Sequence, residues 1–276
     1  FWARRFTYPL LSRRQPPVDV VHILDHSSAY LMTHLPPEAK VIVTVHDLIP
    51  LQYEEGLTPS QHARFRRCVE HLRSATLLVA VSAATQHAIE SELGIPRERI
   101  VVVPNGVEQR FRSQLAVVPA LEKLRGRNVL LSIGSTQPRK NLQIFPGLLA
   151  ALKTDLPDVC LVRVGASLPS SLRQQIQQTI GAENLVELGF VNEEDVPGVY
   201  QAADVLVFPS LHEGFGLPLL EAMLAGCPVA SSNATSLPEV GGDAAIYFDP
   251  ISAAYAVSGV SKILRDCELR DGLIHS

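Results

Sequence analysis

The feature that most constrains the fold is a series of short, apolar, β-branched runs, each followed by a turn or helix signal. Such runs occupy residues 18–24, 40–46, 76–81 and 100–103, and then 128–133, 159–164, 184–188, 205–208 and 228–231. Continuous apolar runs of this length, separated by helical segments, are typical of strands buried on both faces of a parallel sheet. The sequence therefore predicts an α/β protein in which strands and helices alternate.

A break in this rhythm suggests two domains. The apolar pattern lapses from about residue 111 to 126 and then resumes, and 276 residues exceed one average domain. We predict two Rossmann-like doubly wound domains, residues 1–112 and 128–276, joined by a linker at 113–127, with ligands at the carboxyl ends of the strands. Because the chain starts at Phe1 without an initiator Met, we expect the first domain to be incomplete at its start.

Composition excludes several classes of protein. Lys plus Arg is 24 and Asp plus Glu is 28, for a net charge of −4, which argues against nucleic acid as a partner. The four cysteines form no CxxC pair, so neither a zinc knuckle nor a disulfide framework is indicated. No apolar run approaches the roughly 18 residues of a membrane-spanning helix. We expect a cytoplasmic protein.

The most informative segment is FPSLHEGFGLPLLEA, residues 208–222. A buried strand ends there, a loop with two glycines follows, and a proline stands where a helix would begin. Glycine permits close backbone approach to a ligand, and the free N–H groups of a helix start favour a diphosphate. Two carboxylates, Glu213 and Glu221, bracket the loop and are suited to accept hydrogen bonds from sugar hydroxyl groups.

This segment resembles the E-x7-E signature, in its EGFGLPxLE form, of the retaining GT-B glycosyltransferases of family 4. The family fold has two Rossmann-like domains facing a cleft. The resemblance implies that Glu213 contacts the donor sugar and Glu221 the ribose of the nucleotide. It also implies that the backbone of Phe215, Gly216 and Leu217 meets the phosphates and sugar of the donor.

A second loop, residues 133–141, follows the first strand of the second domain and precedes a helix. Its two cations, Arg139 and Lys140, suit a diphosphate that departs with negative charge, although an ordinary basic loop would also read this way. The loop resembles the family's G-x-x-x-x-R-K-N segment. That resemblance implies that Arg139 and Lys140 bind the pyrophosphate and that Gly134 lies near the donor.

Three further positions are implied by the resemblance. A lone histidine beside an aspartate, as in His46 and Asp47 at the end of the second strand, is more often structural. Family members, however, carry a histidine here that approaches the donor sugar, which makes His46 the active-site residue expected on the acceptor side. By analogy, Phe190 and Val191 would flank the nucleotide base.

The resemblance implies a retaining, metal-independent transfer of a hexose from a nucleotide-diphosphate sugar to an acceptor hydroxyl. The nucleotide sugar is a substrate, so no cofactor is expected. The motif forms resemble bacterial mannosyl- and rhamnosyltransferases of polysaccharide assembly, and we predict GDP-mannose as the donor. Two alternatives stay open: a sugar-nucleotide epimerase or phosphorylase on the same architecture, and a catalytically idle nucleotide-sugar-binding module.

The acceptor is expected to be a glycan or a lipid-linked glycan. Residues 1–14 combine aromatic side chains with four arginines, and Arg64, Arg66, Arg67 and Arg73 could extend this basic patch. Such composition suits peripheral contact with anionic lipid at the inner face of a membrane. The alternative is that these are solvated helix and loop residues of a shortened domain.

Overall fold

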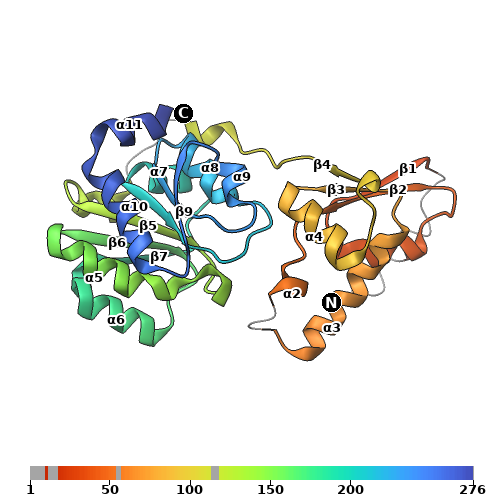
Figure 1. Ribbon diagram of the computed structural model, residues 1–276, viewed down its shortest axis with the longest axis horizontal. Coiled ribbons are helices and arrows are strands. Elements are labelled where there is room, and N and C mark those ends of the chain that lie inside the picture. Colours follow the sequence, from red (N-terminus) through yellow and green to blue (C-terminus); the bar gives the residue numbers. More distant parts are fainter. Residues whose placement is uncertain (1–9, 12–17, 54–56, 113–117, 276) are drawn as a thin grey trace. The chain divides into compact units, whose positions relative to one another are not determined.

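The computed structural model describes residues 10–11, 18–53, 57–112 and 118–275 of the chain. The chain divides into two compact units, residues 1–105 and 106–276, each built on one parallel sheet (Figure 1). The predicted α/β class is confirmed. The division falls upstream of the segment 113–127, and Leu121 and Leu124 of that segment are buried in the second unit's core.

The first unit has a four-stranded parallel sheet in the order β1-β2-β3-β4. Its strands are β1 (Val20–Ile23), β2 (Lys40–Val45), β3 (Leu77–Ala80) and β4 (Ile100–Val102). The helical segments are η2 (His26–His34), α2 (Ile49–Gln52), α3 (Pro59–Glu70), η3 (His71–Ser74), α4 (Ala83–Leu93) and η4 (Arg97–Arg99). Buried valines of β2 pack with leucines of η3 and α4, so helices and sheet share one core.

Side-chain caps fix where the helices of the first unit begin. Thr58 accepts a hydrogen bond from the N–H of Gln61, and the Gln61 side chain accepts one from the N–H of Thr58, which is a complete capping box at α3. Ser82 accepts from the N–H of Thr85 at the start of α4. Each such cap stabilises its helix by about 1 kcal/mol.

The second unit has a six-stranded parallel sheet in the order β10-β9-β8-β5-β6-β7. Its strands are β5 (Asn128–Gly134), β6 (Val159–Gly165), β7 (Leu185–Gly189), β8 (Val205–Phe208), β9 (Val229–Ser232) and β10 (Ala245–Phe248). The chain builds outward from β5 to β7 and then returns to pair β8 with the other edge of β5. The topological switch point, where α/β proteins bind ligands, therefore lies between β5 and β8.

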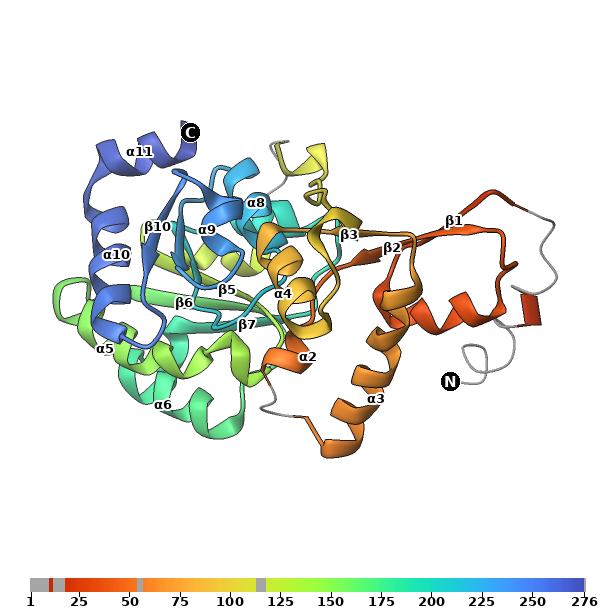
Figure 2. The ribbon, with the colours of Figure 1, turned by 45° about the vertical axis from the view of Figure 1, so that its right-hand side comes forward.

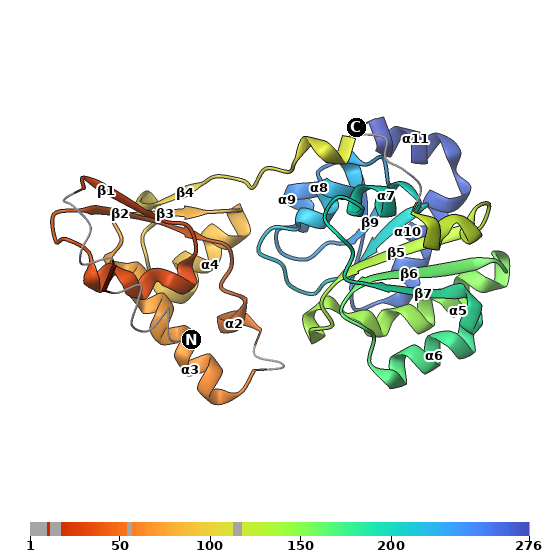
Figure 3. The same cartoon turned by 180° about the vertical axis from the view of Figure 1, so that it is seen from behind.

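Helices cover both faces of this sheet. One face carries α5 (Phe145–Asp155), α6 (Ser170–Ile180), α10 (Ala253–Arg265) and α11 (Cys267–His275), of which α5 and α6 lie side by side (Figure 2). The other face carries α7 (Val196–Gln201), α8 (Leu217–Leu224) and α9 (Leu237–Gly241) (Figure 3). Short 3-10 turns, η5 to η9, occupy Gln109–Arg112, Pro119–Leu124, Pro138–Lys140, Leu142–Ile144 and Ala182–Asn184.

Two of the expected helix starts are displaced. Asparagine is a favoured N-cap residue, so the sequence predicts that the helix before β8 is capped by Asn192, but that helix, α7, begins at Val196. The carbonyl of Asn192 instead accepts a hydrogen bond from the N–H of Asp195 in a preceding turn. Similarly, the apolar segment between β5 and β6 predicts a helix near Leu142 to Leu152, but it begins with a 3-10 turn and α5 starts at Phe145.

The predicted membrane contact falls largely on residues that the structure does not describe. Of the basic aromatic segment 1–14, only Leu10 and Leu11 are among the described residues. None of the helices in the described ranges is long and apolar enough to cross a bilayer.

Candidate active site

Two loops of the second unit meet at the switch point. One follows β5 and carries residues 135–144, and the other follows β8 and carries residues 209–216. Because β5 and β8 are adjacent and parallel, both loops leave the same edge of the sheet. The N–H of Leu211 donates a hydrogen bond to the carbonyl of Arg139 across 2.7 Å, which joins the two loops directly.

Glu213, the carboxylate predicted in one loop, pairs with both cations predicted in the other loop. One carboxylate oxygen accepts from the Arg139 guanidinium at 2.9 Å, and the other accepts from the ammonium of Lys140. The three side chains are mostly buried, with exposed fractions of 10% for Glu213, 20% for Arg139 and 13% for Lys140. Arg139 also donates to the carbonyl of His212 at 2.9 Å, so its guanidinium is fixed at two points.

Burial governs the electrostatics of this cluster. Burial lowers the pKa of Lys140, and the carboxylate of Glu213 opposes that shift. The ammonium lies 5.0 Å from the centroid of the Phe208 ring, within the range of a cation–π contact. A Cβ on Gly134 would lie 3.7 Å from Lys140 Cε, so Gly134 lies beside the same lysine. The cluster holds more positive than negative charge and suits an anion.

The loop that carries Glu213 is held by two hydroxyl groups. The N–H of Glu213 donates to Thr235 Oγ1 at 3.0 Å, and Ser236 Oγ donates to the carbonyl of Phe215 at 2.8 Å. Neither Thr235 nor Ser236 was identified from the sequence. They lie more than twenty positions downstream, and no local pattern links them to the loop.

The glycine at the start of α8 is required by its surroundings. Gly216 has a φ of 113°, and a Cβ there would lie 2.7 Å from Leu237 Cδ2. Leu217 is the first residue of α8 and Phe215 is buried just before it. The first N–H groups of a helix lack partners within it, so this end of α8 favours an anion, as the sequence suggested.

Glu221 lies further along α8 and has a different partner from Glu213. The hydroxyl of Tyr200 donates to its carboxylate at 2.8 Å. Burial raises the pKa of Glu221, and the hydrogen bond from Tyr200 partly opposes the shift. Tyr200 is fully buried and was not identified from the sequence. Glu213 thus pairs with two cations, whereas Glu221 pairs with a neutral phenol.

The residues expected near the base follow β7. Phe190 is 89% exposed, and Val191 is half-buried against the core that contains Tyr200. An aromatic ring with this exposure has no structural role in the core of its own unit.

His46 follows β2 in the first unit. Its Nε2 lies 2.9 Å from the carbonyl of Leu24, and its backbone N–H donates to Nδ1 of His26 at 3.4 Å. His26 is buried, and burial lowers its pKa. Sequence reasoning missed His26. Asp47 accepts a hydrogen bond from the N–H of Ile49 at 3.1 Å, so its carboxylate stabilises the start of α2.

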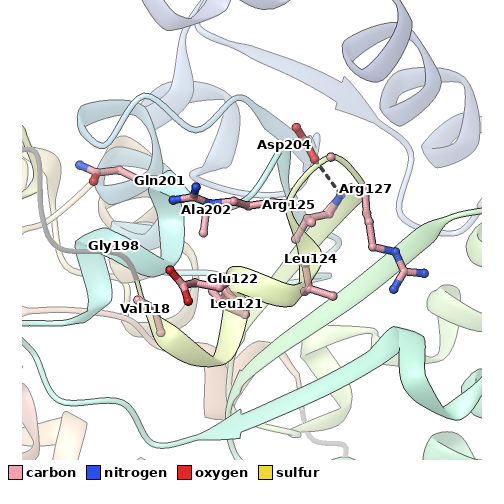
Figure 4. A pocket seen from close by; sticks show the side chains of 12 residues that line it. Val118, Leu121, Glu122, Leu124, Arg125, Arg127, Gly198, Gln201, Ala202 and Asp204 are labelled. Carbon is pink, nitrogen blue, oxygen red and sulfur yellow. Dashed lines mark hydrogen bonds between the residues drawn. The ribbon is translucent and has the colours of Figure 1, made fainter.

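A cavity of about 340 Å³ lies at the opposite, amino edge of the six-stranded sheet, lined by η6, Arg125, Gln201 and Asp204 (Figure 4). The carboxylate of Asp204 accepts from the N–H of Val129 at 2.8 Å, so this acid stabilises the start of β5. None of the residues predicted to bind the donor lines this cavity. Within the described ranges, no group of three or more His, Cys, Asp or Glu side chains is arranged to hold a metal ion.

Solved structures define the class of this fold. WaaG, a glycosyltransferase involved in lipopolysaccharide biosynthesis, matches with a TM-score of 0.72 and 21% identity over 94% of this chain and 72% of that chain. Anabaena Alr3699/HepE, solved in complex with UDP, matches with a TM-score of 0.76 and 20% identity over 97% of this chain and 74% of that chain. The fold is that of a GT-B glycosyltransferase, as predicted.

Two protein-family models match this chain. Residues 117–275 match the model of the glycosyl transferases group 1, and residues 1–111 match that of glycosyltransferase family 4. The chain belongs to the group 1 glycosyl transferases.

Curated relatives cover most of this chain but are longer. The O-antigen chain mannosyltransferase B of Escherichia coli is 34% identical over 84% of this chain and 63% of its own length. The serotype-specific mannosyltransferase WbdA of Escherichia coli is 29% identical over 84% of this chain and 31% of its own length. The O-antigen chain mannosyltransferase RfbU of Salmonella typhimurium is 27% identical over 75% of this chain and 56% of its own length. The chain therefore spans less than two thirds of each of these relatives.

Proposed function

We propose that this chain forms the donor-binding and part of the acceptor-binding portion of a retaining glycosyltransferase that moves a hexose from a nucleotide-diphosphate sugar to an acceptor hydroxyl. One observation carries the proposal. Arg139 and Lys140, at the end of β5, meet Glu213, at the end of β8, in a mostly buried cluster at the switch point of the sheet. Sheets of this order bind nucleotides at that position.

The arrangement suggests how a donor would be held. A diphosphate would replace Glu213 as the partner of Arg139 and Lys140, with Gly134 beside it and the N–H groups at residues 215–217 contacting its oxygens. Glu213 would then be released to accept a hydrogen bond from a hydroxyl of the transferred sugar.

The remaining site residues complete this assignment. Glu221, with its second acceptor capacity unused by Tyr200, would bind the ribose, and Val191 with Phe190 would flank the base. His46 would approach the donor sugar from the acceptor side.

The proposed transfer develops negative charge on the departing diphosphate. The bond between the anomeric carbon and the leaving phosphate oxygen breaks, and the acceptor oxygen bonds to the same face of the sugar, which retains the configuration. The leaving phosphate oxygen takes the acceptor proton. Arg139, Lys140 and the N–H groups at 215–217 would stabilise the departing diphosphate by several kcal/mol through preorganised electrostatics. These groups would supply the positive charge for which other transferases use a metal ion.

We further propose GDP-mannose as the donor and a glycan or lipid-linked glycan as the acceptor. Support for mannose comes from the relatives above, three of which are named as mannosyltransferases. A lipid-linked acceptor would place the first unit near a membrane surface, where the exposed Arg64, Arg66 and Arg67 of α3 suit anionic headgroups. Flotation with anionic and neutral liposomes tests this contact, and equal recovery from both would contradict it.

Thermal unfolding with GDP, UDP and dTDP tests the proposed function. A ligand at 100 times its dissociation constant adds about 2.7 kcal/mol to the free energy of unfolding, which is readily measured. We expect GDP to stabilise the protein most, and incubation with GDP-mannose to yield GDP. Stabilisation by none of the three nucleotides would overturn the proposal. Binding without turnover of the donor, even with acceptor glycans present, would indicate the idle binding module instead.

A further inference from the structure

A charged side chain lies in the middle of the second unit's sheet. Arg163 on β6 is 1% exposed and is among the largest fully buried side chains of the described residues. Its neighbours Val162 and Val164 pack into the core beneath α7, α8 and α9. Because side chains alternate along a strand, Arg163 lies on the other face, beneath α5 and α6.

The contacts of Arg163 are concentrated on one nitrogen. Nη2 donates to the carbonyl of Gly134 at 2.6 Å and to that of Ser135 at 3.0 Å. Nε and Nη1 have no hydrogen-bond partner among the described residues. The adjacent carboxylate, Glu187, is already held by Arg173 and by the N–H of Leu168. Burying a guanidinium with two unsatisfied nitrogens is unfavourable, so its presence there needs a reason beyond packing.

The two carbonyls that Arg163 holds belong to the loop that begins the donor site. In a trans peptide the C=O and N–H of one unit point in opposite directions, and the described chain has no cis peptide bond. With the carbonyls of Gly134 and Ser135 directed at Arg163, the N–H groups of Ser135 and Thr136 face away from it. Gly165 on β6 permits this arrangement, because a Cβ there would lie 2.3 Å from the carbonyl oxygen of Gly134.

We propose that Arg163 is a positioning residue for the donor diphosphate: by holding the carbonyls of Gly134 and Ser135 it turns the N–H groups of Ser135 and Thr136 toward the phosphates. The inference rests on the function proposed above. The positive charge of Arg163 acts in the same direction: Arg163 lowers the pKa of Lys140 by charge repulsion, so both cations add to the positive potential at the phosphate site. Burial lowers the pKa of Arg163 only to about 10, so Arg163 stays charged at neutral pH.

The test compares Arg163→Lys and Arg163→Met with the wild type in binding to GDP, inorganic pyrophosphate and guanosine. Guanosine lacks the phosphates and reports only base and ribose contacts, whereas pyrophosphate reports the phosphate site whichever base the donor carries. Arg173→Met is the matched control, because it removes a cation that contacts the same Glu187 without touching the loop.

We expect Arg163→Met to weaken GDP and pyrophosphate binding about tenfold, equivalent to about 1.4 kcal/mol, while guanosine affinity stays within about twofold. Arg163→Lys keeps a charged donor and should recover part of the loss, and Arg173→Met should leave all three affinities unchanged. An unchanged ratio of diphosphate to guanosine affinity in Arg163→Met overturns the inference; if that variant does not fold, the same ratio in Arg163→Lys decides. A wild type that binds none of the three probes contradicts the proposed function instead.

Discussion

Replacing Glu213 by glutamine should reveal how far this carboxylate stabilises the empty site. The substitution keeps the shape of the side chain but removes the charge that faces Arg139 and Lys140. Breaking a buried ion pair from one side costs about 3–5 kcal/mol. Since the three side chains retain 10–20% exposure, we expect a smaller loss of about 2–3 kcal/mol.

The assay is thermal unfolding with and without inorganic pyrophosphate. For a unit of this size, 1 kcal/mol corresponds to about 2–4 °C, so Glu213→Gln should lower the Tm by about 4–12 °C. Pyrophosphate should raise the Tm of the variant more than that of the wild type, because in the variant the anion meets two cations that have no carboxylate to displace.

Glu194→Gln is the matched control for this experiment. Glu194 is exposed and lies in the same unit, and the substitution makes the same chemical change. The Tm of the Glu194→Gln variant should therefore equal that of the wild type. A Tm for Glu213→Gln within about 1 °C of the wild type would refute the view that Glu213 neutralises the two cations. A smaller response to pyrophosphate than in the wild type would refute the idea that diphosphate replaces Glu213.

Three further predictions concern the same unit. Replacing Arg139 and Lys140 together by alanine should weaken binding of a nucleoside diphosphate at least tenfold and leave nucleoside binding nearly unchanged, as titration calorimetry can measure. Glu221→Ala should mainly weaken donor binding and Glu213→Ala should mainly slow transfer, so equal losses of nucleotide affinity in both would contradict the separate roles. Burial raises the folded-state pKa of Glu221 above 4.5, so the folded chain keeps the carboxyl proton to a higher pH than the unfolded chain does. The free energy of unfolding should therefore fall as the pH rises from 4.5 through the raised pKa, and urea unfolding should show a smaller fall in Glu221→Gln.

The sequence predicted the sheets well because burial on both faces leaves continuous apolar runs. The strands that contain Leu161 and Val207 follow this rule, because every residue of β8 and all but the last residue of β6 are buried. The last strand, Ala245–Phe248, was not predicted, because the helix before it, α9, has only five residues and leaves little helical signal between two strands. Asn192 lies in a turn rather than at an N-cap because the same residue type favours both positions.

The candidate site was predictable where its residues end adjacent strands. Arg139, Lys140 and Glu213 lie in loops whose motifs could be read locally. Tyr200 and Thr235 could not be found, because each contacts the site through a hydrogen bond spanning 21 or 22 residues that no periodic pattern records. Arg163 did leave a signal: a charged residue inside a buried apolar strand is costly, and that cost should have marked it as functional.

The order of strands in the second sheet also dictates when the site can exist during synthesis. Arg139 is made 74 residues before its partner Glu213, and the intervening chain forms β6, β7 and their helices. Until β8 emerges, β5 presents an unpaired edge and the two cations at its end have no carboxylate. A nascent chain that stops short of β8 would thus bear an open strand but no nucleotide site, and the ability to hold a diphosphate would arise only after β8 and the loop that carries Glu213 have been made, when both edges of β5 are paired.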